Sequence, residues 1–273
     1  DRWLILIAYL MGLSIGVHLL NLLAIPAIVL VYYFRKYTPS TEGVIGAMLI
    51  SGIILAIVLY GIIPGFVEVA SWFELLFFFS LGFSYNSGLF AYIILTILSL
   101  SWALYEANSE NSHIRLTISF ILAVTLVGIP FFGAHIVLGI LIVAALAFLF
   151  YYKKQFISRR WLSTALAMIT VILIGYSSYT VIVIRSAANP PMDQNSPDNV
   201  FALKYYLNRE QYGDRPLLYG SVYNAPVKLD IKGNMCVPAE EKGAAQYAPK
   251  PKTSPDEKDE YIITGYKLNY KMD

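Results

Sequence analysis

Residues 3–34 read WLILIAYLMGLSIGVHLLNLLAIPAIVLVYYF, an apolar run that contains no Asp, Glu, Lys or Arg. As a single helix these 32 residues would be about 48 Å long, whereas the hydrocarbon core of a bilayer is about 30 Å thick. The run is therefore either one tilted helix kinked at Pro26 or two short spans that turn over near His18–Asn21. The hairpin is favoured, because it leaves Arg2 and Arg35 on one face of the membrane.

The charged residues are unevenly distributed along the chain. Of the 38 Asp, Glu, Lys and Arg residues, 15 lie in residues 1–185 and 23 in residues 186–273. With 57% hydrophobic residues and a mean hydropathy of +0.59, the chain is predicted to be an all-α polytopic membrane protein of six to seven short spans. Residues 186–273 are predicted to form a small α+β extracytoplasmic segment. The net charge of +2 averages two unlike parts, and no basic stripe predicts nucleic-acid binding.

Five further spans are predicted, at Val44–Ile63, Leu89–Tyr105, Ile114–Ile129, His135–Tyr152 and Trp161–Ile184. Pro64-Gly65 is expected to end the first of them. The positive-inside rule places both Arg35 and the basic residues of 153–160 in the cytoplasm, so an even number of crossings separates them. Phe66–Phe83 is then predicted to be an interfacial helix on the outer face, with Glu68 and Glu74 exposed to water.

The same parity predicts that everything after Arg185 lies outside the cytoplasm. In this outer segment we expect a short helix at Asn199–Glu210 capped by Asp198, and strands at Leu217–Ile231 and Tyr261–Tyr270. Residues 239–260 are rich in Lys, Glu, Pro and Ala and are expected to form a mobile loop. The single cysteine cannot form an internal disulfide.

Polar residues near the first turn are the best candidates for a binding site. Gly12 and Gly16 form a Gly-x-x-x-Gly pattern that favours close helix packing, with Ser14 hydrogen-bonding nearby. His18 and Asn21 would instead face the headgroups of the outer leaflet, where an ionisable group indicates function.

His135 and Arg185 are predicted to lie at the same face of the membrane. Each has a plain alternative, as an interfacial histidine and as an arginine that snorkels from the end of the last span. Together with His18 they have the donors to bind a phosphate. No metal-ligand spacing and no acid/base pair is evident, so no metal or cofactor is expected. Asp193 lies in a Pro- and Asn-rich stretch that favours turns.

Two blocks of sequence carry a resemblance to a known family. They are Gly-Leu-Ser-Ile-Gly-Val-His-Leu-Leu-Asn at residues 12–21, and Asn-Pro-Pro-Met-Asp-Gln-Asn-Ser-Pro at 189–197 followed by Tyr-Leu-Asn-Arg-Glu-Gln-Tyr-Gly-Asp-Arg-Pro-Leu-Leu-Tyr-Gly at 206–220. They resemble a polytopic membrane family catalogued as a domain of unknown function. That family is similar to the transmembrane protein O-mannosyltransferases of the GT-C superfamily, so the resemblance implies a GT-C-like helix bundle.

The resemblance implies transfer of a sugar, with mannose as the expected sugar, from a polyprenyl-phosphate carrier to a Ser or Thr hydroxyl of an exported protein. It implies that His18, Asn21, His135 and Arg185 contact the lipid phosphate. Asp193, Arg209 and Tyr212 would contact the acceptor.

The acidic base of such enzymes lies in a first outer loop, which would precede Asp1, so this chain alone is expected to be inactive. The expected location is an integral membrane position, in the plasma or inner membrane if the protein is bacterial. The alternatives are a transporter or lipid flippase, and a non-catalytic assembly subunit.

Overall fold

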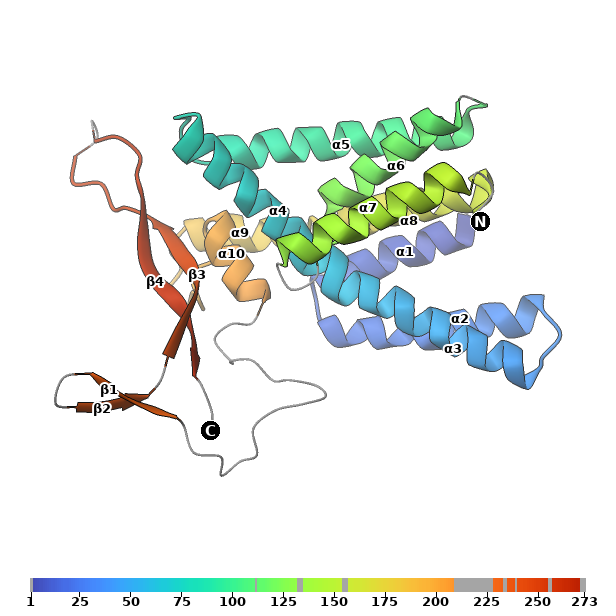
Figure 1. Cartoon of the computed structure of the whole chain (residues 1–273), viewed down its shortest axis with the longest axis horizontal. Coiled ribbons are helices and arrows are strands. Elements are labelled where there is room, and N and C mark those ends of the chain that lie inside the picture. The colour runs from blue at the N-terminus through green and yellow to red at the C-terminus, as the bar shows by residue number, and fades with distance from the viewer. Residues whose placement is uncertain are drawn as a thin grey trace. The chain divides into compact units, whose positions relative to one another are not determined.

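A computed structural model of the chain describes residues 2–110, 112–131, 135–153, 157–208, 228–232, 235–238, 240–254 and 257–270. The chain divides into two compact units, a helical unit of residues 1–204 and a strand unit of residues 205–273 (Figure 1). The predicted fold class, all-α and polytopic with a small α+β segment, is confirmed. The predicted boundary at residue 185 separates the transmembrane residues from the extracytoplasmic ones. That boundary stays a prediction.

The helices are α1 (Arg2–Ile15), the 3₁₀ turn η1 (Leu19–Leu23), α2 (Ala24–Lys36), α3 (Thr41–Ala56), the π-helical η2 (Ile57–Ile62), α4 (Ile63–Leu75), the π-helical η3 (Leu76–Ser80), α5 (Ser87–Asn108), α6 (His113–Val127), α7 (Ile136–Tyr152), α8 (Arg159–Tyr176), α9 (Tyr179–Ala187) and α10 (Val200–Leu207). Among the described residues, four helical stretches are long and apolar enough to cross a membrane: Leu19–Lys36, Thr41–Ser80, Ser87–Asn108 and Arg159–Ala187. Helices α1, α6 and α7 are apolar but shorter.

The first apolar run forms a helical hairpin. Helix α1 ends at Ile15, η1 makes the turn, and α2 runs back toward the end of the bundle where the chain begins (Figure 1). The reading in which residues 3–34 turn over near His18 is therefore confirmed. Pro26 does not kink a long helix, because it lies in the first turn of α2, where its missing N–H is not needed.

The prediction that Pro64-Gly65 ends a helix is wrong. Helical structure continues from Thr41 to Ser80, and Pro64 is the second residue of α4. Proline is tolerated in a first turn, and the π-helical residues 57–62 rearrange the backbone hydrogen bonds just before it. Phe66–Phe83 is thus largely a continuation of the preceding helix, and its placement on the outer surface stays a prediction.

Helices α1 and α8 run parallel and pack closely. A methyl group added at Gly12 would lie 2.5 Å from the carbonyl oxygen of Ile172 on α8, and one added at Gly175 would lie 2.5 Å from the backbone nitrogen of Leu13. Gly16 approaches the hydroxyl of Ser178 in the same way. The close packing predicted for Gly12 is confirmed, because only a residue without a Cβ allows these two backbones to meet, whereas the close neighbour of Gly16 is the Ser178 side chain.

Basic residues collect at one end of the helical unit, which we call the basic end. It contains the first turns of α1, α3, α6 and α8 and the last turns of α2, α5 and α7 (Figure 1). Lys36 Nζ lies 5.7 Å from the ring centroid of Trp161, and His113 Nε2 donates to the carbonyl oxygen of Phe150 at 2.6 Å. The opposite end, which contains the α1–α2 turn and the α6–α7 connection, is called the hairpin end below.

The strand unit contains two antiparallel hairpins. Strand β1 (Leu229–Lys232) pairs with β2 (Met235–Pro238), and β3 (Glu240–Pro249) pairs with β4 (Tyr261–Tyr270), with two register shifts along the second pair. The strand predicted at Tyr261–Tyr270 is confirmed. The prediction of a loop over residues 239–260 is wrong for its first half, because β3 satisfies its backbone groups against β4.

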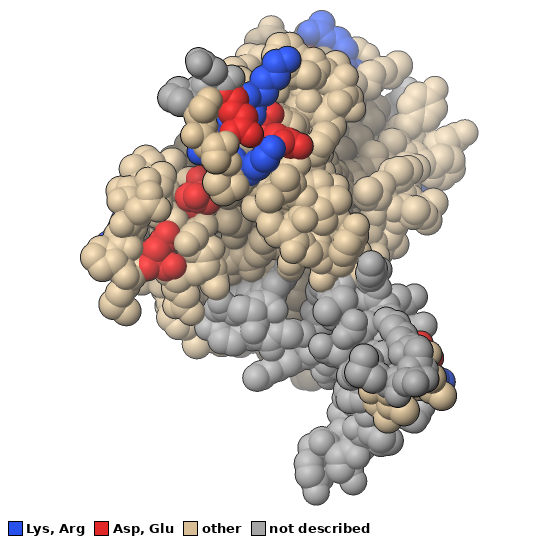
Figure 2. Space-filling view, turned by 90° about the vertical axis from the view of Figure 1, so that its left-hand side faces the viewer, with Lys and Arg blue, Asp and Glu red and all other residues tan. Residues whose placement is uncertain are grey.

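The connection between β3 and β4 carries paired charges. Lys250 Nζ contacts Glu257 at 3.3 Å and Glu260 at 2.7 Å, and Lys252 Nζ contacts Asp259 at 2.8 Å. Figure 2 shows acidic and basic side chains interleaved in one cluster on a face that is otherwise largely uncharged. Composition alone predicted little order in this stretch, but the lysines of its first arm pair with the acidic residues of its second arm.

Candidate functional site

The turn between α1 and α2 holds His18 in a defined orientation. The backbone N–H of Leu20 donates to His18 Nδ1 at 3.1 Å, so the ring caps the short η1 helix. Because Nδ1 accepts this hydrogen bond, the neutral ring carries its proton on Nε2. His18 is exposed, and its Nε2–H is a donor available to an anion at the hairpin end. Asn21, also exposed, lies on the next turn.

The other predicted phosphate contacts also lie on the surface. His135 precedes α7 and Arg185 is in the last turn of α9, and both side chains are exposed. No hydrogen bond or ion pair among the described residues links His18, His135 and Arg185 to one another. Their convergence on one ligand stays a prediction.

Of the predicted acceptor contacts, only Asp193 is described. Its Oδ2 accepts from the hydroxyl of Ser186 at 2.6 Å, which ties the turn after α9 back to that helix. This local bond agrees with the turn-forming role weighed for Asp193. Arg209 and Tyr212 lie outside the described residues.

Helix α10 begins with a different cap from the one predicted. The side-chain oxygen of Asn199 accepts from the backbone N–H groups of Phe201 and Ala202, each at 3.0 Å. Asn199 therefore caps the helix, and Asp198 instead accepts from the Asn199 side chain at 2.7 Å.

Two tyrosines fix the junction between α8 and α9 against the rest of the bundle. The Tyr176 hydroxyl donates to the carbonyl oxygen of Ile63 at 3.1 Å, and the Tyr179 hydroxyl donates to that of Ile15 at 3.2 Å. Ile15 is the last residue of α1, so the second bond links this junction to the turn that carries His18. The hairpin end is thereby held by side-chain to backbone bonds from distant parts of the sequence.

The prediction that Glu68 and Glu74 are exposed to water is wrong. Glu68 is 5% exposed and Glu74 is fully buried. Both oxygens of Glu68 lie 2.9 Å from Lys204 Nζ, so the charge on α4 is neutralised by a lysine on α10. The partner is 136 residues away in the sequence, which is why local spacing did not reveal it.

Glu74 is satisfied in another way. Its two oxygens accept from the backbone N–H groups of Asn86 at 2.6 Å and Leu89 at 3.1 Å, at the beginning of α5. The carboxylate therefore caps the N-terminus of the next helix, where a negative charge also interacts favourably with the helix dipole. The sequence signal for both glutamates is an acidic residue within an apolar stretch, which by itself does not reveal the groups that satisfy it.

A third buried carboxylate, not singled out from the sequence, lies at the basic end. Glu106 is fully buried on α5, and its Oε1 accepts from Trp102 Nε1 at 3.0 Å and lies 2.6 Å from Arg115 Nη2. Arg159 donates to the backbone carbonyl oxygens of Glu106 and Ser109, which are among the last of α5. These bonds satisfy the C-terminus of α5 with a cation.

The chemistry that this arrangement supports is binding rather than bond-breaking. At the hairpin end, imidazole and amide donors are exposed, while the glutamates of α4 are occupied by partners. No group of three or more His, Cys, Asp or Glu residues with metal-site geometry occurs among the described residues. The exposed donors fit an anion such as a phosphate.

One comparison with known proteins bears on this end of the molecule. Residues 1–41 match the family model described as the N-terminal domain of the protein O-mannosyl-transferase TMEM260. The matched residues comprise α1, η1 and α2, and so include His18 and Asn21. No curated protein and no solved structure matches the chain.

Proposed function

We infer that this chain is part of an integral-membrane mannosyltransferase. In this proposal the enzyme moves mannose from a polyprenyl-phosphate carrier to a Ser or Thr hydroxyl of an exported protein. The observation that carries it is the similarity of residues 1–41 to a domain of a protein O-mannosyltransferase. The helical, polytopic fold supports it, because a polyprenyl carrier is reached from within the bilayer.

The lipid phosphate is assigned to the hairpin end. His18 supports this assignment, because its Nε2–H points away from the bond that Nδ1 makes with Leu20. Asn21, His135 and Arg185 complete the proposed set of phosphate contacts, and an amide, an imidazole and a guanidinium are all suited to phosphate oxygens. These donors would hold the leaving phosphate as its negative charge develops.

The catalytic base is not assigned to the glutamates of α4. A base must accept a proton from the acceptor hydroxyl, but Glu68 is paired with Lys204 and Glu74 accepts two backbone N–H groups. We therefore expect the base in the acidic outer loop that the resemblance implies. Asp193, Arg209 and Tyr212 are the proposed acceptor contacts.

The test is a transfer assay with membranes that contain the natural protein. Polyprenyl-phosphate mannose labelled in the sugar is supplied together with a Ser/Thr-rich peptide, and labelled peptide is measured. His18→Ala is expected to raise the KM for the donor about tenfold, the effect of losing one hydrogen bond to a charged group. The KM for the peptide should not change.

His113→Ala is the matched control, because it removes a histidine bonded at the basic end. It should lower thermal stability without changing the donor KM. Absence of mannosyl transfer by the natural protein would remove the proposal and favour a transporter or an assembly subunit. An unchanged donor KM in His18→Ala would remove only the assignment of His18.

A further inference from the structure

The basic end combines positive charge with a ring of exposed aromatic side chains. Among the described residues it carries seven Lys and Arg residues and three acidic ones. The basic residues are Arg2, Arg35, Lys36, Arg115, Lys153, Arg159 and Arg160. The exposed aromatic residues at the same helix ends are Trp3, Tyr37, Tyr105, Tyr151, Tyr152 and Trp161. Trp and Tyr concentrate where a bilayer meets water, so we expect this end at the depth of the lipid headgroups.

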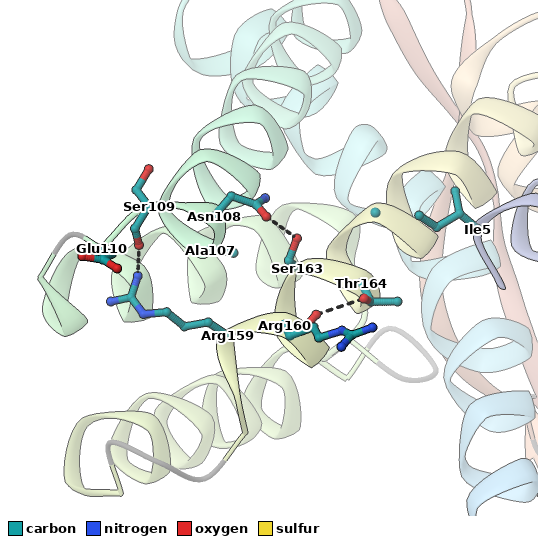
Figure 3. Close-up of a pocket in the computed structure, with 10 residues that line it drawn as sticks. Ile5, Ala107, Asn108, Ser109, Glu110, Arg159, Arg160, Ser163 and Thr164 are labelled. Atoms are coloured by element: carbon teal, nitrogen blue, oxygen red, sulfur yellow. Dashed lines mark hydrogen bonds between the residues drawn. The ribbon is translucent and has the colours of Figure 1, made fainter. Parts of the chain in front are cut away.

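A pocket of about 480 Å³ opens at this depth. It lies between the end of α5, the first two turns of α8 and the first turn of α1 (Figure 3). Its apolar lining comes from Ile5, Ala107 and Ala167, and its polar lining from Asn108, Ser109, Glu110, Arg159, Arg160, Ser163 and Thr164. The pocket thus offers an apolar wall beside polar and cationic groups.

The two arginines of the pocket have different positions. Arg159 reaches toward the end of α5, where it donates to the carbonyl oxygens of Glu106 and Ser109, and Glu110 lies beside it (Figure 3). Arg160 extends in the opposite direction and is exposed (Figure 3). Lys36 adds charge on this side, because its Nζ lies over the ring of Trp161, the next residue.

The polar wall of the pocket is held rigidly. The Ser163 hydroxyl donates to Asn108 Oδ1 at 3.0 Å, which joins α8 to the end of α5. The Thr164 hydroxyl donates to the carbonyl oxygen of Arg160 at 2.9 Å. The α8 side of the pocket, which carries Arg160, is thus joined to the end of α5 by the bond between Ser163 and Asn108.

We propose that this pocket binds the phosphate of an anionic phospholipid from the leaflet that the basic end faces. Arg160 pairs with the phosphate, Lys36 adds to the attraction, and the glycerol backbone lies along Ile5 and Ala167. A basic pocket between helices at headgroup depth is suited to an anionic headgroup. A soluble phosphate ester has the same charged group, but it would gain nothing from the apolar wall.

The experiment measures binding of fluorescent phosphatidylglycerol to the full chain in detergent micelles, with phosphatidylcholine as the neutral comparison. Arg160→Gln should weaken phosphatidylglycerol binding roughly fivefold, the effect of losing one basic residue near a membrane surface. Ala167→Leu should also weaken it, because it fills the pocket without changing charge. Glu110→Gln should strengthen it, since it removes a negative charge from the lining.

Arg35→Gln is the matched control. Arg35 is exposed at the same end and carries the same charge, but it does not line the pocket. The affinity of the Arg35→Gln variant for phosphatidylglycerol should equal that of the natural chain within experimental error. Equal losses in Arg35→Gln and Arg160→Gln would mean that the lipid responds only to the overall charge, which overturns the proposal.

A competition experiment with soluble glycerol phosphate distinguishes a lipid site from a site for soluble phosphate esters. If it displaces the fluorescent lipid at concentrations comparable to the lipid itself, the site is one for soluble phosphate esters, and the lipid assignment is wrong. Thermal unfolding of each variant in the same detergent micelles verifies folding. Ala167→Leu and Glu110→Gln keep the proposal testable if Arg160→Gln fails to fold.

Discussion

Gly12 determines how closely α1 and α8 can approach. A Cβ at this position would point at the backbone of Ile172. Any side chain there would therefore collide with main-chain atoms that cannot move independently. Gly175 provides the matching space on α8. The pattern of glycines predicted close packing, but it did not identify the partner helix, which lies more than 140 residues later in the chain.

We predict that Gly12→Ala destabilises the helical unit. The new methyl group would lie 2.5 Å from Ile172 O, so α1 and α8 must separate, at a cost of about 1–3 kcal/mol. Gly52→Ala on α3 is the control, because open space surrounds that position. It should stabilise the protein by roughly 0.5–1 kcal/mol through helix propensity. Thermal unfolding in detergent measures both, and equal effects of the two substitutions would contradict the explanation.

Helix α4 shows where prediction from sequence was limited. The apolar runs that follow it were sufficient to predict α5, α6 and α7 to within a few residues. The burial of Glu68 and Glu74 was not predicted, because the groups that satisfy them come from α10 and from the beginning of α5. A carboxylate in an apolar stretch looks solvated until its partner is known.

The ion pair between α4 and α10 provides a second prediction. Glu68→Leu or Lys204→Met alone leaves one buried charge without its partner and should cost about 3 kcal/mol. The double variant should recover most of that loss, because it buries no charge. Lys252→Gln, which breaks a more exposed pair with Asp259, should cost less than about 1 kcal/mol. Additive losses in the double variant would show that the two residues do not stabilise each other.

The connection between β3 and β4 provides a pH-dependent prediction. The backbone N–H and the hydroxyl of Thr253 donate to Glu257, and with the Lys250 ammonium they lower the pKa of that carboxyl from 4.5 to about 2. A lowered pKa stabilises the folded form above the unfolded value, and this contribution is lost as the pH falls from about 4.5 through about 2. Carboxyl chemical shifts should give Glu257 this low midpoint.

Thr253→Ala removes the hydroxyl that donates to Glu257 and should move the Glu257 midpoint upward, toward 4.5. Lys258→Gln is the control, because Lys258 is exposed and the substitution removes a charge from the same connection. A midpoint that moves equally in both variants would mean that general charge, and not the Thr253 bonds, sets the pKa.

The basic end of the helical unit predicts how the protein is oriented in the membrane. The basic end is expected in the cytoplasm and the strand unit outside it. Cys236 is exposed on β2 and is the single cysteine of the chain, so it reports the side of the membrane directly. A membrane-impermeant maleimide should label Cys236 in intact cells, and Cys236→Ser should abolish labelling. Labelling that requires inverted membranes would reverse the orientation.

The cap that Glu74 places on α5 has a consequence for biogenesis. While α4 is being inserted, Glu74 lacks the donors that Asn86 and Leu89 supply, because the beginning of α5 is still inside the ribosomal exit tunnel. A lone carboxylate is costly in hydrocarbon, so α4 should stay beside the translocon until the beginning of α5 emerges. The two helices would then enter the lipid as one unit. Chains stalled when α4 has left the ribosome but the beginning of α5 is still in the exit tunnel should crosslink to the translocon through α4. Chains stalled after the whole of α5 has emerged should lose that crosslink.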